Sequence, residues 1–370
     1  MRLASTLMMR FAERTHILDA SAPPARYLWT DAFAVCNFIE MGRNDLALAL
    51  VDRVHRTLGR YSPEDTRTGW ISGLEAHTAE LHPTIGGLRI GKPLPERKPS
   101  EPFNERLEWD RDGQYFHYLT KWMHALDQLT YATGDPSFNK WARELAESAF
   151  RRFVHGSPPT MYWKMSVDLS RPLVSSMGQH DPLDGYVTCL ELMETAADFG
   201  VPGIDLREAS AGFGAMVDPT RLATVDPLGI GGLLVDAYRI AHLPVRDPAL
   251  VFTILNASRL GLAHYVAEID LQERASHRLA FRELGLAIGL AAMSKLPELA
   301  ARTGLDRHLS LRQDIEAFWL RPENREVRTW VEHADINDVM LATSLAPEGF
   351  LHVSRGGRSE SPIAPTYYER

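Results

Sequence analysis

The sequence DAFAVC at residues 31–36 returns as DGYVTC at residues 184–189. Each copy has an acid, a small residue, an aromatic ring, two β-branched or small residues and a cysteine, and DGQYF at residues 112–116 is a looser third copy. DPLG at 226–229 and NDVM at 337–340 are further places where an acid is followed by apolar residues, as at the start of a helix. Each acid precedes a segment that is apolar nearly all round a helix, which is typical of an interior helix. The repeat therefore predicts several buried helices that begin at an acid.

Helical spacing dominates the rest of the chain. Residues 44–54 place apolar side chains three and four positions apart behind Asn44 and Asp45, which indicates an amphipathic helix with a polar start. Similar patterns predict helices at 114–133, 136–155, 182–199, 227–242, 247–265, 279–295 and 310–320. Long alternating β-branched runs are absent from the sequence, so strands are expected only as short hairpins.

Amphipathic and apolar helices alternate along the chain. Segments 44–60, 136–155 and 247–265 have charged faces and are expected on the outside. Six inner helices are counted around Asp31, Asp112, Asp184, Asp226, Arg282 and Asp338. This order resembles the (α/α)6 toroid of the six-hairpin glycosidases and of the N-acylglucosamine 2-epimerase group. The resemblance implies an all-α fold, with a single toroid domain over residues 1–370.

Charge and cysteine content exclude several classes of protein. A formal charge of -8 argues against a nucleic-acid binder, because phosphate contact depends on clustered cations. Cys36 and Cys189 are too few for a disulfide framework or a cysteine-based zinc site. The apolar stretch at the N-terminus is interrupted by Arg10 and is too short for a spanning helix, so we expect a cytoplasmic protein without a membrane partner.

Residues 61–107 differ from the helical segments around them. His82-Pro83, Gly86-Gly87 and Gly91-Lys92-Pro93 break any helical pattern, so we expect a long loop. A loop of this length is either an insertion on the surface or a lid over a binding site. Both interpretations remain open, and the second places the loop over the mouth of the toroid.

Aromatic and histidine side chains gather near the predicted inner-helix starts. The candidate substrate-binding residues on this ground are Trp29, Trp109, Tyr115, His117, His180 and Tyr186, together with Asp338 and Arg282. If the inner helices run parallel in a ring, these side chains meet at one face. Aromatic rings pack against the apolar face of a sugar while carboxylates and imidazoles bind its hydroxyls, so the expected partner is a soluble saccharide or a related polar molecule.

Paired carboxylates make glycoside hydrolysis the favoured reaction. The reaction needs one protonated and one ionised carboxyl group beside the scissile bond. Asp112 and Asp184, from neighbouring inner helices, are the leading pair, and Asp31 and Asp338 are held in reserve. For Asp31, Asp184 or Asp338 taken singly, and likewise for Asp226, capping of its own helix is the stronger interpretation.

Two alternatives remain beside the hydrolase. A cofactor-free sugar epimerase or isomerase would use His277 and His333, which precede the fifth and sixth inner helices. For either histidine alone, a helix-start side chain hydrogen-bonded to its neighbours is the stronger interpretation. Arg282 either belongs to a buried ion pair or binds a substrate carboxylate or phosphate. The third interpretation is a non-catalytic helical scaffold that binds a ligand. No metal and no cofactor are expected, and the oligomeric state is left open.

Overall fold

The computed structural model describes residues 2–19, 25–244, 247–268 and 273–353. Within these ranges the chain is mostly α-helical, with eighteen α-helices and five strands of two or three residues each. The predicted all-α class is confirmed. The described residues divide into two compact units: unit 1 holds those between residues 2 and 217 together with 334–350, and unit 2 holds those between residues 218 and 333 together with 351–353.

Unit 1 contains the acid-led repeat. Its helices are α1 (Arg2–Arg14), α2 (Leu28–Glu40), α3 (Asn44–Leu58), α4 (Ala76–Leu81), α5 (Glu105–Asp110), α6 (Phe116–Thr133), α7 (Ser137–Phe153), α8 (Asp181–Asp198), α9 (Arg207–Met216) and α17 (Ala334–Leu345), and α18 (Glu348–Leu351) begins in this unit. The ranges of α3, α6, α7 and α8 agree with the predicted segments to within a few residues.

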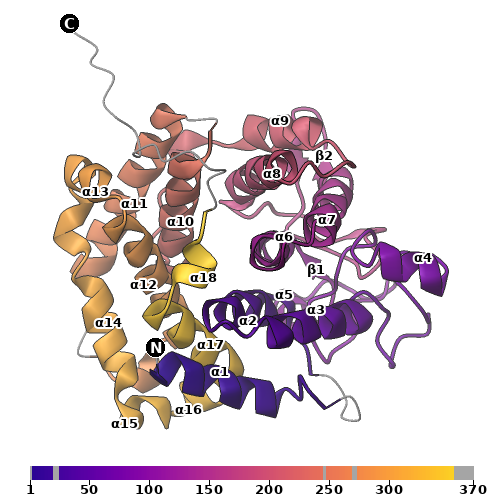
Figure 1. The fold of residues 1–370 in the computed structure, drawn as a ribbon, viewed down its shortest axis with the longest axis horizontal. Coiled ribbons are helices and arrows are strands. Elements are labelled where there is room, and N and C mark those ends of the chain that lie inside the picture. Colours follow the sequence, from indigo (N-terminus) through magenta and orange to yellow (C-terminus); the bar gives the residue numbers. More distant parts are fainter. Residues whose placement is uncertain (1, 20–24, 245–246, 269–272, 354–370) are drawn as a thin grey trace, which may run out of the picture. The chain divides into compact units, whose positions relative to one another are not determined.

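The interior of unit 1 is a row of buried helices. Helix α17 packs on α2, α2 on α6, and α6 on α8, so that α6 lies between α2 and α8 (Figure 1). Helices α1, α3, α7 and α9 pack against α17, α2, α6 and α8, respectively. Helix α2 is buried at every residue from Leu28 to Phe38, whereas α3 buries one face only. The predicted alternation of apolar and amphipathic helices is thus present within unit 1.

Two small antiparallel sheets are present, one beside the start of α6 and one at the end of α7. Strands β1 (Gln114–Tyr115), β4 (Lys164–Met165) and β5 (Pro172–Val174) form one sheet, and β2 (Val154–His155) pairs with β3 (Thr160–Met161). Tyr115 is paired with Lys164, and the Phe116 amide donates to the Trp163 carbonyl at 3.4 Å. This pairing places Trp163, which is distant in sequence, beside the first turn of α6.

The 61–107 segment is attached to the starts of α2 and α6. The Ile90 carbonyl accepts from the Leu28 amide at 3.0 Å, and the Ile90 amide donates to the Gly113 carbonyl at 2.8 Å. The segment is not wholly a loop, because α4 lies within it and α5 begins in it. Helix α5 forms because the Asn104 side chain accepts the Leu107 amide and caps its first turn.

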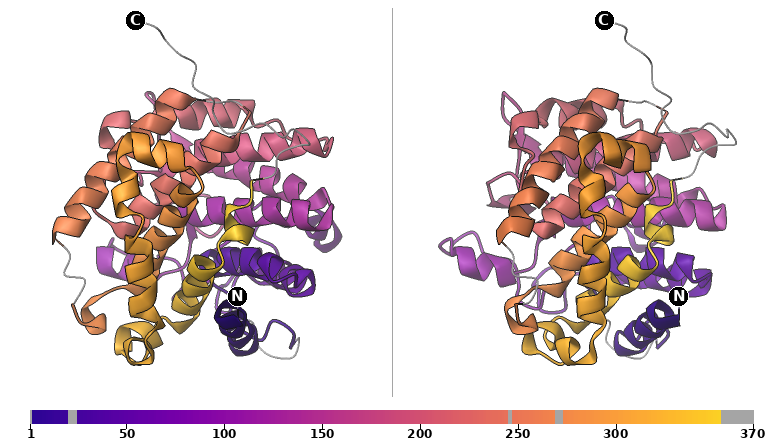
Figure 2. Two further views of the ribbon diagram at one scale, coloured as in Figure 1. Left: turned by 60° about the vertical axis from the view of Figure 1, so that its left-hand side comes forward. Right: turned by 90° about the vertical axis from the view of Figure 1, so that its left-hand side faces the viewer.

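Unit 2 is a second group of helices, coloured from salmon to orange in Figures 1 and 2. They are α10 (Pro227–His242), α11 (Pro248–Glu268), α12 (Ala280–Ser294), α13 (Pro297–Thr303), α14 (Leu311–Leu320), α15 (Pro322–Arg325) and α16 (Arg328–Val331). Helix α10 has the bounds predicted from the sequence, because Asp226 caps it by accepting the Gly229 amide at 2.9 Å. Pro227 occupies the first helical position, where its missing N–H costs nothing.

Glycines allow α10 and α12 to cross at close range. A Cβ atom at Gly231 would lie 2.2 Å from the Gly285 carbonyl oxygen, and one at Gly289 would lie 2.6 Å from the Gly231 carbonyl oxygen. Both distances are far below van der Waals contact. The contact between these helices therefore requires residues without a side chain.

Helix α11 is long and apolar enough to cross a membrane by length and composition. It has 21 residues, and 44% of its most apolar window is buried inside the structure. Helices α12 and α13 pass the same test only as a pair, and they are bent by 108° relative to each other. A core helix of a globular protein meets the same criteria, so this feature does not identify a membrane span.

Candidate functional site

Side chains join the amino-terminal ends of α2, α6 and α8. Tyr27 immediately precedes α2, and its hydroxyl lies 2.6 Å from the hydroxyl of Tyr118 in the first turn of α6. Lys121 of α6 donates to both carboxylate oxygens of Asp184, at 2.9 and 2.8 Å. Asp184 lies in the first turn of α8. Three of the acid-led or aromatic helix starts are therefore brought together within unit 1.

Aromatic rings gather around the start of α6. The aromatic cluster consists of Trp29, Trp109, Tyr115, His117, Tyr118 and Trp163. Ring centroids are 4.7 Å apart for Trp109 and Trp163, 5.3 Å for Tyr115 and Tyr118, and 4.7 Å for His117 and Tyr118. Trp109 is 46% exposed and Trp163 is half-buried, so the cluster presents ring surface to solvent.

The histidine of this cluster is neutral at pH 7. Burial, with the Lys121 ammonium acting in the same direction, lowers the pKa of His117 to about 4. A neutral imidazole can donate one hydrogen bond and accept another, which suits a sugar hydroxyl. His117 therefore offers binding capacity without adding charge.

Asp184 is buried and ion-paired. Besides the two bonds from Lys121, its Oδ2 accepts from the Thr120 hydroxyl. The nearby ammonium and these hydrogen bonds favour the ionised carboxylate. Asp184 can therefore stabilise positive charge or accept a proton.

Asp181 is the first residue of α8 and differs from the other acids. It is buried, and its Oδ2 has no hydrogen-bond partner among the described residues. Burial, and then the negative charge of Asp184, raise the pKa of Asp181 to about 7. A carboxyl group in this state is protonated for part of the time at neutral pH and can donate a proton.

Asp112 has no free carboxylate oxygen. Its Oδ2 accepts from Arg89 at 2.7 Å, and its Oδ1 accepts from the backbone amides of Gly91 and Lys92 at 3.0 and 3.3 Å. Both Asp112 and Arg89 are buried. These bonds hold the 61–107 segment against the start of α6, so the contacts give Asp112 a structural role.

Asp31 is likewise tied to its own helix start. Its Oδ2 accepts from the Tyr27 amide at 3.2 Å, and its Oδ1 lies 3.4 Å from a guanidinium nitrogen of Arg26. Burial raises the pKa of Asp31 to about 6, although Arg26 acts in the opposite direction. Asp31 is the fourth residue of α2, and its bond runs back to the amide of Tyr27, the residue at the N-cap position.

The acids at the remaining predicted starts also have cationic partners. Asp338 in unit 1 pairs with Arg14 at 2.8 Å. Asp226 in unit 2 pairs with Arg282 at 2.6 Å. Arg282 is therefore an ion-pair partner, whereas the buried Arg–Glu pair of unit 2 joins Arg278 to Glu283 through bonds of 2.8 and 2.6 Å.

The two histidines predicted for an epimerase are exposed residues of unit 2. His277 lies in a 3-10 turn and pairs with Glu273 at 3.1 Å. His333 lies between α16 and α17, with its ring centroid 6.5 Å from that of Phe281.

The remaining predicted binding residues belong to the aromatic cluster or to the start of α8. Trp29 is buried, with its ring centroid 6.4 Å from that of Tyr118. His180 is the residue before α8. The ring of Tyr186 faces Gly214 of α9, where a Cβ atom would lie 3.2 Å from it.

Sequence reasoning missed Trp163, Tyr118 and Lys121. Trp163 reaches the site through the pairing of β1 with β4, and no local pattern around residue 163 marks that long-range contact. Lys121 could have been noticed as a cation in a mostly apolar helical segment. Such a cation needs a buried acid as its partner.

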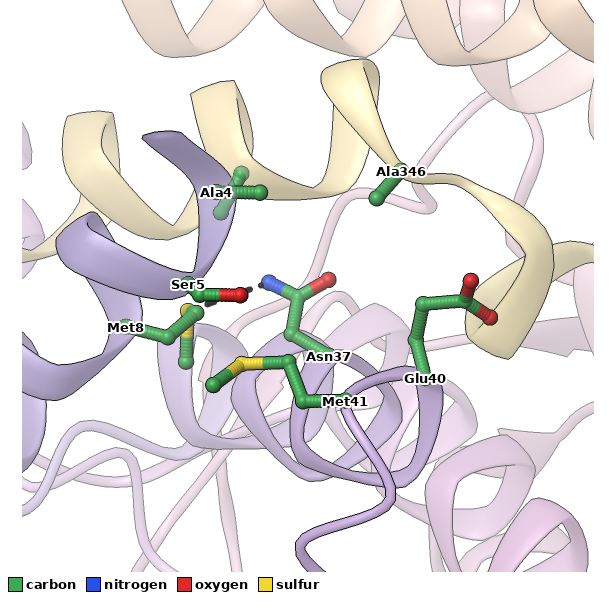
Figure 3. A pocket seen from close by; sticks show the side chains of 8 residues that line it. Ala4, Ser5, Met8, Asn37, Glu40, Met41 and Ala346 are labelled. Carbon is green, nitrogen blue, oxygen red and sulfur yellow. Dashed lines mark hydrogen bonds between the residues drawn. The ribbon is translucent and has the colours of Figure 1, made fainter. Parts of the chain in front are cut away.

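Two cavities lie away from the aromatic cluster. The smaller holds about 10 Å³ between α1, α2 and α17, where the Asn37 amide donates to the Met8 sulfur at 3.3 Å (Figure 3). This volume suits a single water molecule. The larger, of about 230 Å³, lies between α3, α4 and α7. Within the described ranges, no group of three or more His, Cys, Asp or Glu residues is arranged to hold a metal ion.

Comparison of the chain with protein-family models, with curated proteins and with solved structures gives no match.

Proposed function

We propose that this protein is a carbohydrate-active enzyme, a glycoside hydrolase that binds a soluble saccharide on the aromatic cluster. The observation that carries the proposal is the position of Asp181, a buried acid with an unpartnered oxygen, in the same first turn as Asp184. Lys121 pairs Asp184 with the start of α6, where the aromatic cluster lies. Exposed indole surface binds the apolar face of a sugar ring.

Asp181 and Asp184 divide the chemistry between them. Asp181 donates its proton to the glycosidic oxygen as the bond to the anomeric carbon breaks. Asp184, kept ionised by Lys121, either attacks that carbon or takes a proton from the attacking water. Asp181 thereby replaces Asp112 in the pair predicted from the sequence, because both Asp112 oxygens are engaged by Arg89 and the backbone.

The proposal extends to the fold. A single (α/α)6 toroid over the whole chain, with residues 61–107 as a lid at its mouth, would place the starts of all six inner helices at one face. The alternation of inner and outer helices in unit 1 supports it. So do the bonds that tie Ile90 to the starts of α2 and α6.

The test combines a ligand screen with matched variants. Thermal shift against neutral and acidic oligosaccharides identifies a ligand, and reducing-end release measures hydrolysis. We expect Asp181→Asn to lower the hydrolysis rate by about 100-fold or more while the saccharide still binds. Glu13→Gln, which changes an exposed carboxylate of α1, serves as the control and keeps full activity. Equal hydrolysis by wild type and Asp181→Asn would show that Asp181 is not the acid.

A second candidate is a saccharide-binding scaffold without catalysis. The observation that favours it is that Asp31, Asp112, Asp184, Asp226 and Asp338 each pair with a cation. In that case Trp163→Ala abolishes binding of the screened ligand, and no saccharide in the set is cleaved. Cleavage of the bound ligand by the wild type would exclude this candidate.

A further inference from the structure

The larger cavity of unit 1 lies apart from the aromatic cluster and has a composition of its own. It holds about 230 Å³ between α3, α4 and α7, enough for a small organic molecule. Four rings line it, from His55, Trp70, Phe138 and Trp141. The charged residues that line it come from the exposed surfaces of α3 and α4.

The rings are held in place by a hydrogen bond to the backbone and by contacts with one another. The Trp141 indole donates to the Leu81 carbonyl at 3.0 Å. His55 and Trp141 have ring centroids 5.2 Å apart with planes at 82°, and Phe138 and Trp141 have centroids 5.3 Å apart with planes at 86°. Rings that meet near right angles form walls in different directions, which encloses a compact ligand better than a flat one.

The imidazole in this wall carries no charge. The Trp122 indole donates to Nε2 of His55 at 3.2 Å, so the neutral ring has its proton on Nδ1. Burial lowers the pKa of His55 to about 3. His55 therefore cannot supply a positive charge to an anionic ligand at neutral pH.

The rim of the cavity is net negative. Arg56 is the cation among the lining residues, and it pairs with Asp52 at 2.8 Å and with Glu80 at 2.9 Å. Two carboxylates against one guanidinium leave an excess negative charge at the entrance. A negatively charged ligand would be repelled by Asp52 and Glu80, and Arg56 already pairs with both of these carboxylates.

We propose that this cavity binds a small organic cation, an alkylammonium group enclosed by the rings of Trp70, Phe138 and Trp141 beneath the carboxylates of Asp52 and Glu80. Aromatic faces attract such cations through the ring quadrupole, and the attraction strengthens as the cation loses water. The carboxylates add long-range attraction and orient the charge toward the interior. This inference is independent of the hydrolase proposal, because it uses none of the same residues.

The test compares two molecules of one shape. Choline and its uncharged isostere 3,3-dimethylbutan-1-ol are titrated into the full chain by calorimetry at matched ionic strength. We expect choline to bind at least about 10-fold more tightly than the isostere. Equal binding of the two, or binding of the isostere alone, would overturn the proposal and indicate an apolar pocket. Absence of any choline binding would also overturn it.

Variants separate the contributions of the rings and the charges. Glu80→Gln removes an exposed charge without changing shape, and we expect choline affinity to fall by about 3-fold to 10-fold with no change for the isostere. Trp141→Leu should lower choline affinity by more than 10-fold, and Trp141→Phe should retain most of it. Circular dichroism confirms that each variant is folded. Unchanged choline affinity in both Glu80→Gln and Trp141→Leu would refute the site.

Discussion

Asp181→Asn should change how the stability of the protein depends on pH. The pKa of this carboxyl rises from 3.8 to about 7 on folding, so the folded state binds more protons than the unfolded state between these values. The stabilisation that protonation gives the folded state is therefore lost as the pH rises toward 7 and above. Ionisation of Asp181 destabilises the folded protein by at most about 4 kcal/mol. The helix dipole at the N-terminus of α8 favours the negative charge and reduces this cost by about 0.3–1 kcal/mol.

The variant removes this cost because asparagine does not ionise. The free energy of unfolding of Asp181→Asn, relative to wild type, should increase by about 2 kcal/mol between pH 5 and pH 8. A constant loss from a poorly bonded amide cancels in this comparison. Urea unfolding followed by tryptophan fluorescence measures it, with Glu13→Gln as the control. A difference that stays the same at both pH values would show that Asp181 is ionised in the folded protein and would refute our account of its environment.

Two further predictions concern structural contacts. Gly231→Ala should destabilise unit 2 by about 2–3 kcal/mol, because its Cβ would collide with the Gly285 carbonyl. Gly232→Ala meets open space and should stabilise the helix by about 0.5–1 kcal/mol. Thermal unfolding of both variants measures these changes, and equal effects would contradict the close crossing of α10 and α12. Arg89→Met should cost about 3–5 kcal/mol by leaving the Asp112 carboxylate buried without its cation. Adding Asp112→Asn should recover part of that loss in denaturant unfolding, and a fully additive double variant would show that the two side chains act separately.

Helices could be predicted from the sequence because their signals are local. The spacing of apolar residues predicts 227–242, and Asp226 with Pro227 marks its start, as α10 shows. The small sheet could not be predicted, since its strands of two or three residues carry no periodic pattern. Its pairing of Tyr115 with Lys164 is what brings Trp163 to the aromatic cluster.

The acids of the candidate site could be predicted from the sequence, but their ion-pair partners and their burial could not. A carboxylate at a helix start is visible in the sequence, whereas its partner belongs to another part of the chain. Arg89 comes from the 61–107 segment to pair with Asp112, and Lys121 comes from a different helix to pair with Asp184. Asp181 lies three residues from Asp184, yet only its buried, unpartnered oxygen distinguishes it as the candidate acid.

The glycine crossing of α10 and α12 limits how this protein can diverge over time. Exposed charged side chains can be exchanged for others without moving the backbone. A side chain at residue 231 or 289 would instead push two helices apart. Substitutions should therefore accumulate more slowly at these two positions than in much of the remaining chain. Glycines at this spacing could identify a distant homologue after most other residues have changed.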